Sequence, residues 1–316
     1  MIASDGVMGT SVRPAWTDLP DQARASVESF AGHTVARADT QTGGFSSGLA
    51  ARLTFTDSAH LFVKGIATGH VLYDRYCEEA AINRALPAAV PVPRLLRTWE
   101  AGGWLLMAFE DVDGRHPVPG PGSDDVDRVL ALLDRLPATV TPSPIPDAPG
   151  FVAAVGEEFL GWQLLADAGT GLDPWSARHL ADLTATERDW QRDGAGITLL
   201  HADLRPDNTI LADTGDVAID WAYLHQGAAW VDPAMFLPHL IRAGYTPAQA
   251  EAAMTAVTAW NNASTATLTS FAIALTGYWE RCSRYPGPPG VPYLRPYQAE
   301  MADIGRRWIQ YRTGWS

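Results

Sequence analysis

Short apolar runs separated by turn-forming residues fill the first third of the chain. The runs 49–55 and 61–66 flank Asp57 and Ser58, and another apolar run begins at Trp104. Runs of this length between turns are typical of β-strands. The pattern therefore predicts a small antiparallel sheet within the first third of the protein.

Apolar residues follow a different spacing after residue 115. They recur every three or four positions, as at Phe151, Val155 and Phe159, which is the repeat of a helix with one buried face. Serine, threonine or aspartate begins or precedes most of these segments, as expected at helix N-termini. The predicted helices, including one within the first third, span 74–86, 124–136, 151–165, 173–191, 232–243, 246–260, 264–281 and 296–312.

These patterns predict an α+β fold with two parts. Residues 1–110 would form a sheet-containing N-terminal lobe that ends in a linker, and residues 111–316 would form a mostly helical C-terminal lobe. The chain has 316 residues, of which 47% are hydrophobic and 19% charged. That composition is typical of a folded globular protein with a sizeable core.

The charge balance limits the possible partners. The formal net charge is −13, which argues against a nucleic-acid partner because such binding needs a positive surface. The same charge is compatible with a cationic small molecule. Nothing in the sequence predicts the oligomeric state.

Features of the chain also bear on its compartment. Cys77 and Cys282 are the two cysteines, with no spacing for a disulfide framework or a zinc site. The first seventeen residues lack the apolar core of a signal peptide, and no apolar run is as long as a membrane span. We therefore expect a cytoplasmic protein without a membrane partner.

The segment 200–221 carries the most specific chemistry. It contains His201, Asp203, Asn208 and Asp220, and short apolar runs with a glycine-bearing turn separate them. The two runs after Asn208 predict a β-hairpin that brings Asn208 and Asp220 to the same end. Two carboxylates and an amide oxygen can hold Mg²⁺ and orient a hydroxyl toward the terminal phosphate of a nucleotide.

A metal-dependent hydrolase is the alternative interpretation of His201 and Asp203. Such a site needs further histidines at matching spacing. His179, His225 and His239 show no such spacing. The complete motif therefore favours phosphoryl transfer.

The order His-x-Asp-x-x-x-x-Asn, followed by a strand that ends in Asp220-Trp221, resembles the aminoglycoside phosphotransferase family. That family shares its fold with protein kinases, whose motif has Arg at the place of Ala202 and Phe-Gly at the place of Trp221-Ala222. Both differences favour the small-molecule branch. The resemblance extends over about residues 40–312 and implies a two-lobed protein-kinase-like fold.

The resemblance also implies roles for the motif. Asp203 would orient the acceptor hydroxyl or accept its proton, and Arg205 would neutralise charge on the transferring phosphoryl group. Asn208 and Asp220 would ligate Mg²⁺. His201 is expected to be structural. Asp232, a simple helix cap by sequence, would brace this loop through backbone hydrogen bonds.

A glycine-rich turn precedes the only strand that contains a lysine. Gly43, Gly44 and Ser46 would let backbone amides approach the phosphates, although the turn matches no established phosphate-loop pattern and an ordinary hairpin is the alternative. Lys64 lies inside an apolar run, where an unpaired charge is costly. The resemblance implies that Lys64 contacts the α- and β-phosphates. The alternative is a lysine on an edge strand that blocks aggregation.

A glutamate on the following helix should pair with that lysine. The helical periodicity does not choose between Glu78 and Glu79. The resemblance selects Glu79 as the partner and leaves Glu78 as a solvated neighbour.

The run from Trp104 into an acidic turn corresponds to the linker between the two lobes. The resemblance implies that backbone groups of Ala108, Phe109 and Glu110 bond the adenine edge and that Met107 lines its pocket. A buried strand that enters a loop would have the same composition.

The predicted function is transfer of the γ-phosphate of ATP or GTP to a hydroxyl of a small molecule, with Mg²⁺. Candidate acceptors are aminoglycosides or related natural products, in a resistance role, and metabolic amino alcohols or sugars. A protein kinase is disfavoured because no A-P-E-like segment follows Asp220. A nucleotide-binding pseudoenzyme that acts as a regulator is the alternative outside enzymes. Candidate contacts for a cationic acceptor, each also explained as a surface charge, are Glu157, Glu158, Asp167 and Glu280.

Overall fold

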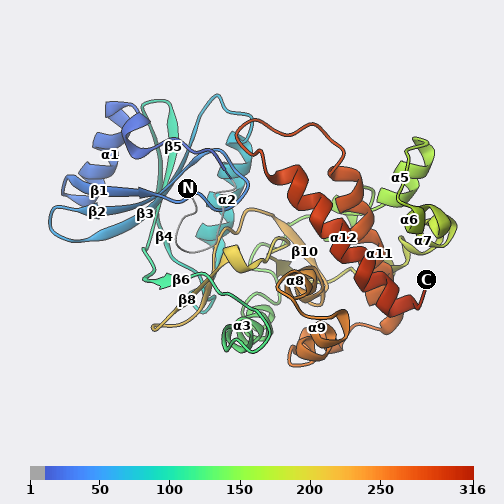
Figure 1. Cartoon of the computed structure of the whole chain (residues 1–316). Coiled ribbons are helices and arrows are strands. Elements are labelled where there is room, and N and C mark those ends of the chain that lie inside the picture. Colours follow the sequence, from blue (N-terminus) through green and yellow to red (C-terminus); the bar gives the residue numbers. More distant parts are fainter. Residues whose placement is uncertain (1–10) are drawn as a thin grey trace.

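The computed structural model describes residues 11–316 (Figure 1). Most of the segment that we expected not to be a signal peptide therefore lies outside the described residues. No helix among the described residues is both long and apolar enough to cross a membrane. The α+β prediction is confirmed, because a sheet with two helices is followed by a mostly helical part (Figure 1).

The N-terminal part is a five-stranded antiparallel sheet with the order β1-β2-β3-β5-β4. One face packs on α1 (Asp21–Ala31) and the other on α2 (Tyr73–Ala85), because alternate side chains of each strand point to opposite faces. A short 3₁₀ turn, Trp16–Asp18, precedes α1. The strands are β1 (Val35–Thr40), β2 (Leu49–Phe55), β3 (His60–Ala67), β4 (Leu95–Ala101) and β5 (Trp104–Phe109).

The register of the sheet settles the position of Lys64. In β3, Lys64 lies opposite Ala50 of β2 and opposite Met107 of β5. Because β3 has a partner on both sides, the edge-strand interpretation of Lys64 is wrong. Its side chain projects toward the α2 face, where only a paired charge is tolerated.

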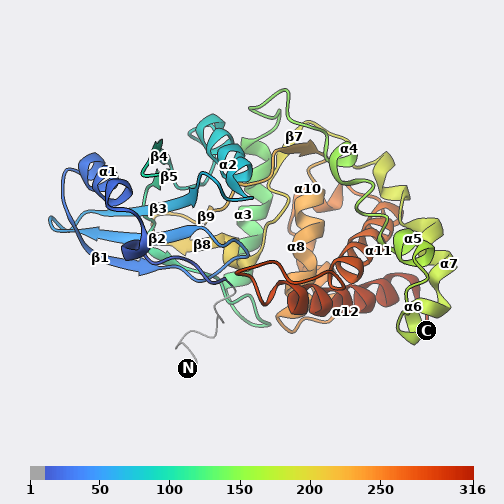
Figure 2. The ribbon, with the colours of Figure 1, turned by 90° about the horizontal axis from the view of Figure 1, so that it is seen from above.

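The second part is mostly helical (Figures 1 and 2). Its main helices are α3 (Asp125–Thr139), α4 (Phe151–Val155), α5 (Gly161–Asp167), α6 (Pro174–Arg178), α7 (Leu180–Thr186), α8 (Val231–Arg242), α9 (Pro247–Met254), α10 (Thr258–Asn261), α11 (Thr265–Cys282) and α12 (Leu294–Thr313). Short strands and 3₁₀ turns connect them: β6 (Gly114–Arg115), Asp189–Arg192, β7 (Thr198–Leu200), Pro206–Asn208, β8 (Thr209–Ala212), β9 (Val217–Ala218) and β10 (His225–Gly227).

Side-chain caps explain where several helices begin. The carboxylate of Asp173 accepts the N–H groups of Trp175 and Ser176, and the hydroxyl of Ser264 accepts the N–H of Thr267. Thr246 forms a capping box with Gln249 at the start of α9. Each bond satisfies a donor that the helix itself leaves free.

Three of the predicted helices are not continuous in the structure. The segment 151–165 is broken between α4 and α5, 173–191 is divided into α6, α7 and a 3₁₀ turn, and 246–260 is divided into α9 and α10. In the second case the buried carboxylate of Glu187, just after α7, accepts the N–H groups of Trp162 and Gln163 at the start of α5. Apolar spacing alone does not reveal such breaks.

The hydrophobic core of the helical part also includes the end of α2. Ile82 and Leu86 belong to the same buried cluster as Trp162, Trp190 and Phe271. Helix α2 therefore packs against both parts of the molecule and lies between them (Figure 1). This position couples the helix that carries Glu79 to the loops of the helical part.

Gly161→Ala is expected to lower the free energy of unfolding by about 3 kcal/mol, the upper end of the usual range for overpacking. A Cβ at Gly161 would lie 2.1 Å from the backbone of Gly277 in α11, so the two helices would have to separate. Urea unfolding measures the effect. Gly171→Ala is the matched control, because its Cβ meets nothing within 4 Å; equal stability of the two variants would contradict the prediction.

Candidate active site

The loop after β7 is fixed by hydrogen bonds to its backbone. Asp232, in the first turn of α8, accepts the N–H groups of His201 at 2.9 Å and Ala202 at 2.8 Å. The Nε2 of the fully buried His201 is hydrogen-bonded to the carbonyl of Ile219 at 2.9 Å. Ala202 has a φ of +58°, a conformation that glycine adopts more readily. The predicted structural roles of His201 and Asp232 agree with these bonds.

Asp203 follows this braced turn and remains accessible. Its side chain is 30% exposed, and its Oδ1 lies 3.4 Å from Nη1 of Arg205. Partial removal from water raises the pKa of the Asp203 carboxyl to about 6, and the Arg205 guanidinium only partly offsets that rise. A carboxylate with this pKa is ionised at neutral pH and still basic enough to accept a proton.

Arg205 is buried and held on several sides. It donates from Nε and Nη2 to Asp207 at 3.0 and 3.1 Å, in addition to its ion pair with Asp203. The ring of Phe45, from the glycine-rich turn, lies 4.9 Å from the guanidinium carbon and 4.9 Å from the ring of Tyr297 in α12. The guanidinium therefore positions Asp203 and supports the glycine-rich turn at the same time.

Asn208 contacts Asp203, and Asp220 contacts Lys64. The Nδ2 of Asn208 donates to the carbonyl of Asp203 at 2.8 Å, and strands β8 and β9 bring the chain back to Asp220. Oδ1 of Asp220 lies 2.7 Å from Nζ of Lys64. Within residues 11–316, no group donates to Oδ1 of Asn208 or to Oδ2 of Asp220. These two oxygens fit the ligand preference of Mg²⁺.

Lys64 connects the sheet to this loop. Its ammonium lies 2.5 Å from Glu79 and 2.7 Å from Asp220. The predicted Lys64–Glu79 pair is confirmed, whereas the contact with Asp220 was not predicted. Burial would raise the pKa of Asp220, but the ammonium outweighs it and lowers that pKa to about 2. Burial raises the pKa of Glu79 to about 7 against the attraction of the same ammonium.

The glycine-rich turn between β1 and β2 contacts α2. A Cβ at Gly48 would lie 2.3 Å from the hydroxyl of Tyr76 and 2.6 Å from the backbone carbonyl of Gly65 in β3, so only glycine fits at this position. Tyr76 also lies within 3.3 Å of the hydroxyl of Ser46. No described residue accepts the backbone N–H groups of Phe45, Ser46 or Ser47, so these donors can bind an anion.

The predicted linker follows strand β5. Met107, Ala108 and Phe109 all lie in β5 with neighbouring strands on both sides, and the N–H of Glu110 donates to the carbonyl of Arg94. The ladder therefore occupies the N–H of Glu110, one of the backbone groups that we expect near adenine. The run is apolar because β5 is central, and the chain leaves the sheet only at Glu110.

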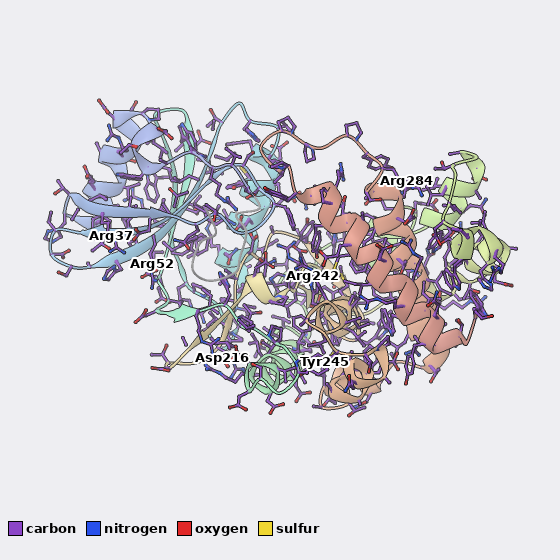
Figure 3. All side chains as sticks on the ribbon, in the orientation of Figure 1. Arg37, Arg52, Asp216, Arg242, Tyr245 and Arg284 are labelled. Carbon is purple, nitrogen blue, oxygen red and sulfur yellow. The ribbon has the colours of Figure 1, made fainter. Side chains whose placement is uncertain are left out.

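The anchor of this linker was missed in the sequence. Arg52 of β2 binds the carboxylate of Asp111 at 2.7 and 2.8 Å and the carbonyl of Val112 at 3.0 Å (Figure 3). An arginine at an outward strand position gives no signal of such a long-range partner. Arg13, which binds the glycine-rich turn from the segment before α1, was also missed, because no local pattern marks a partner about 30 residues away.

Cavities near the linker do not coincide with this cluster of side chains. Two of them, of about 410 and 610 Å³, share Glu110 and Val112 but include neither Lys64 nor Asp203. Among residues 11–316, no group of three or more His, Cys, Asp or Glu side chains is arranged to hold a metal ion. We therefore locate the candidate site at the charged and polar side chains around Asp203 and Asp220.

The chain matches a known family over most of its length. The sequence profile of the phosphotransferase enzyme family matches residues 44–268, which is more than half of the chain and includes Lys64, Glu79, Asp203, Asn208 and Asp220. The chain belongs to the phosphotransferase enzyme family. No curated protein sequence matches it significantly.

Solved structures of this family share the fold. A spectinomycin phosphotransferase in complex with ADP and spectinomycin has a TM-score of 0.61 at 12% identity, over 87% of this chain and 94% of that chain. A choline/ethanolamine kinase family protein from Mesorhizobium loti has a TM-score of 0.60 at 16% identity, over 92% of this chain and 97% of that chain. An aminoglycoside-3′-phosphotransferase of type VIII has a TM-score of 0.56 at 22% identity, over 80% of this chain and 98% of that chain.

Proposed function

We propose that this phosphotransferase moves the γ-phosphate of ATP or GTP to a hydroxyl group of a small molecule, with Mg²⁺, in the cytoplasm. The observation that carries the proposal is the ion pair of Lys64 with both Glu79 and Asp220. It brings a buried cation from the sheet to the loop that holds Asp203 and Asn208. A phosphate-binding cation, metal-binding oxygens and a general base are thereby assembled in one place.

Each side chain has a definite task in this mechanism. Asp203 orients the acceptor hydroxyl and takes its proton as the oxygen attacks the terminal phosphorus. Lys64 binds phosphate oxygens of the nucleotide, and Glu79 keeps its ammonium in place. Arg205 fixes Asp203 by the 3.4 Å ion pair. Such catalysis depends on positioning and on preorganised charge.

Mg²⁺ fits the residues that we assign to it. Asn208 and Asp220 each present an oxygen without a donor among the described residues; Asn208 contacts Asp203, and Asp220 contacts Lys64. Bound there with the nucleotide, the cation would neutralise phosphate charge. The Nδ2 bond of Asn208 to the Asp203 carbonyl turns the amide oxygen away from that carbonyl.

The acceptor class follows from the relatives and from the charges that remain accessible. The structural relatives are named for spectinomycin, aminoglycosides and choline or ethanolamine, all hydroxyl-bearing amines. Glu280 is buried in ion pairs with Arg284 and Arg306, so it does not contact an acceptor. Glu157 and Glu158 are exposed. We therefore propose a hydroxyl-bearing amine as the acceptor.

Nucleotide consumption against a panel of acceptors tests the proposal. The panel contains aminoglycosides, spectinomycin, amino alcohols and sugars, with Mg-ATP and Mg-GTP in parallel. Acceptor-dependent nucleotide turnover with a phosphorylated product is the expected result. Nucleotide binding in a thermal-shift assay without turnover on any acceptor would favour the pseudoenzyme, and phosphorylation of protein substrates alone would favour a protein kinase.

The pH dependence should report Asp203. Because the pKa of this carboxyl is about 6 and the ionised form is the base, we expect kcat/KM to fall about tenfold per pH unit below pH 6 and to level off above it. Protonation of Glu79 would affect nucleotide binding instead. The affinity for Mg-ATP, measured over the same pH range, separates that effect from the effect of Asp203 on kcat/KM. A profile that stays flat from pH 5 to 8 would contradict the role of Asp203.

A further inference from the structure

We propose that Arg13, in the segment before α1, is a positioning residue for the phosphate-binding turn and a second cation for the nucleotide phosphates. The inference rests on the proposed function, because it concerns the same nucleotide site. No motif contains Arg13, and it lies outside the residues that the family profile matches. Its role follows only from what its guanidinium touches.

One guanidinium holds both ends of the glycine-rich turn. Nη2 of Arg13 donates to the carbonyl of Gly43 at 2.8 Å, and Nη1 donates to the carbonyl of Gly48 at 2.9 Å and to the hydroxyl of Ser46 at 3.0 Å. A planar guanidinium presents its donors in a fixed fork. The three bonds therefore set the shape of the turn, which contains no charged side chain of its own.

These bonds also orient the backbone donors of the turn. Three successive carbonyls face the N-terminal segment: Ser11 binds those of Thr42 and Gly44, and Arg13 binds that of Gly43. In a planar trans peptide the N–H points away from the carbonyl. The N–H of Phe45 is therefore directed away from Ser11, and it is one of the amides that lack an acceptor among the described residues. The segment thus turns the N–H of Phe45 outward, where a phosphate oxygen can bind it.

Arg13 is itself held in place. The N–H of Val12 donates to the carbonyl of Gly290 at 2.8 Å, in the connection between α11 and α12. Figures 1 and 2 show this connection reaching back from the helices toward the sheet. The N-terminal segment is therefore bound between the turn and the helical part, so its arginine is positioned before a ligand arrives.

The charge of Arg13 reaches the same site. Burial raises the pKa of the Glu79 carboxyl, and the charge of Lys64 lowers it. The charge of Arg13 also lowers this pKa. Its guanidinium is therefore close enough to the Lys64–Glu79 pair to act on it electrostatically. Phosphate oxygens bound beside Lys64 would experience the same positive charge.

The test compares a ligand with phosphates to one without. We would measure the affinities of Mg-ATP and of adenosine by calorimetry for Arg13→Ala, Arg13→Lys and wild type. We expect Arg13→Ala to weaken Mg-ATP binding about tenfold or more, as loss of a charge-assisted contact does, and to leave adenosine binding within about twofold. Arg13→Lys keeps the charge without the fork and should recover part of the affinity. KM for ATP should rise while kcat changes little.

Arg37→Ala is the matched control, because it removes the same charge from an exposed position on β1, on the side of the sheet away from the helical part (Figure 3). It should bind Mg-ATP like wild type. Equal Mg-ATP affinity of Arg13→Ala and wild type would overturn the inference. Equal losses for Mg-ATP and adenosine would also overturn it, because they would indicate a structural role. If wild type bound no nucleotide, the proposed function itself would fail, and this result is distinct from the other two.

Discussion

Asp203→Asn is expected to lower kcat by about a hundredfold or more, the range for loss of a general base. The amide has the same shape as the carboxylate, and its single oxygen can still accept from one of the two donors, Arg205 or Asn208. It cannot accept the proton of the acceptor hydroxyl. Binding of Mg-ATP should be nearly unchanged, because Lys64, Asn208 and Asp220 remain. The measurements are steady-state nucleotide turnover with an active acceptor and calorimetry with Mg-ATP.

The control for this variant removes a carboxylate from the hairpin that follows the Asp203 loop. Asp213 is exposed in the turn between β8 and β9, so Asp213→Asn should retain the turnover of wild type. Wild-type turnover in Asp203→Asn would remove Asp203 from the role of base. Loss of Mg-ATP binding in that variant would place Asp203 in the nucleotide site instead.

Asp220→Ala is expected to abolish the Mg²⁺-dependent part of nucleotide binding. The change removes a proposed metal ligand and also the carboxylate that lies 2.7 Å from Lys64. The pKa of Asp220, lowered to about 2 by that ammonium, keeps the carboxylate ionised and able to bind a cation throughout the usual assay range. Calorimetry with ATP, with Mg²⁺ present and with Mg²⁺ removed by a chelator, measures the effect.

A second substitution at this position separates charge from conformation. Asp220 has a φ of +67°, which asparagine tolerates better than alanine. Asp220→Asn should therefore fold like wild type, keep one oxygen ligand and bind Mg-ATP with intermediate affinity. Asp213→Ala serves again as the exposed control. Wild-type affinity in both Asp220 variants would show that the metal is held elsewhere.

The sequence predicted the parts of the site that lie within one short segment. His201, Asp203, Asn208 and Asp220 are connected by two tight turns and a hairpin, so their proximity follows from local geometry. The Lys64–Glu79 pair was also predicted, although the choice of Glu79 came from the resemblance to a family. Their roles in catalysis stay predictions that the variants above will test.

The sequence was less informative where two distant segments meet. The predicted helix over 173–191 is divided, and Glu187 after α7 caps a different helix at Trp162. The apolar run at Ala108 gave no sign that β5 is paired on both sides. Apolar periodicity records which residues are buried, and the neighbours that bury them are a property of the folded chain.

The amino-acid sequence by itself determined the α+β class, the order of sheet and helices, and the motif that holds Asp203, because these depend on turns and on repeats within a few residues. Only the tertiary structure decided that Lys64 forms ion pairs with both Glu79 and Asp220, and that Arg13 is hydrogen-bonded to the glycine-rich turn. Those contacts join residues separated by up to 156 positions. A hydrogen bond or ion pair depends on distance in space, and for such separations that distance is fixed only when the whole chain has packed.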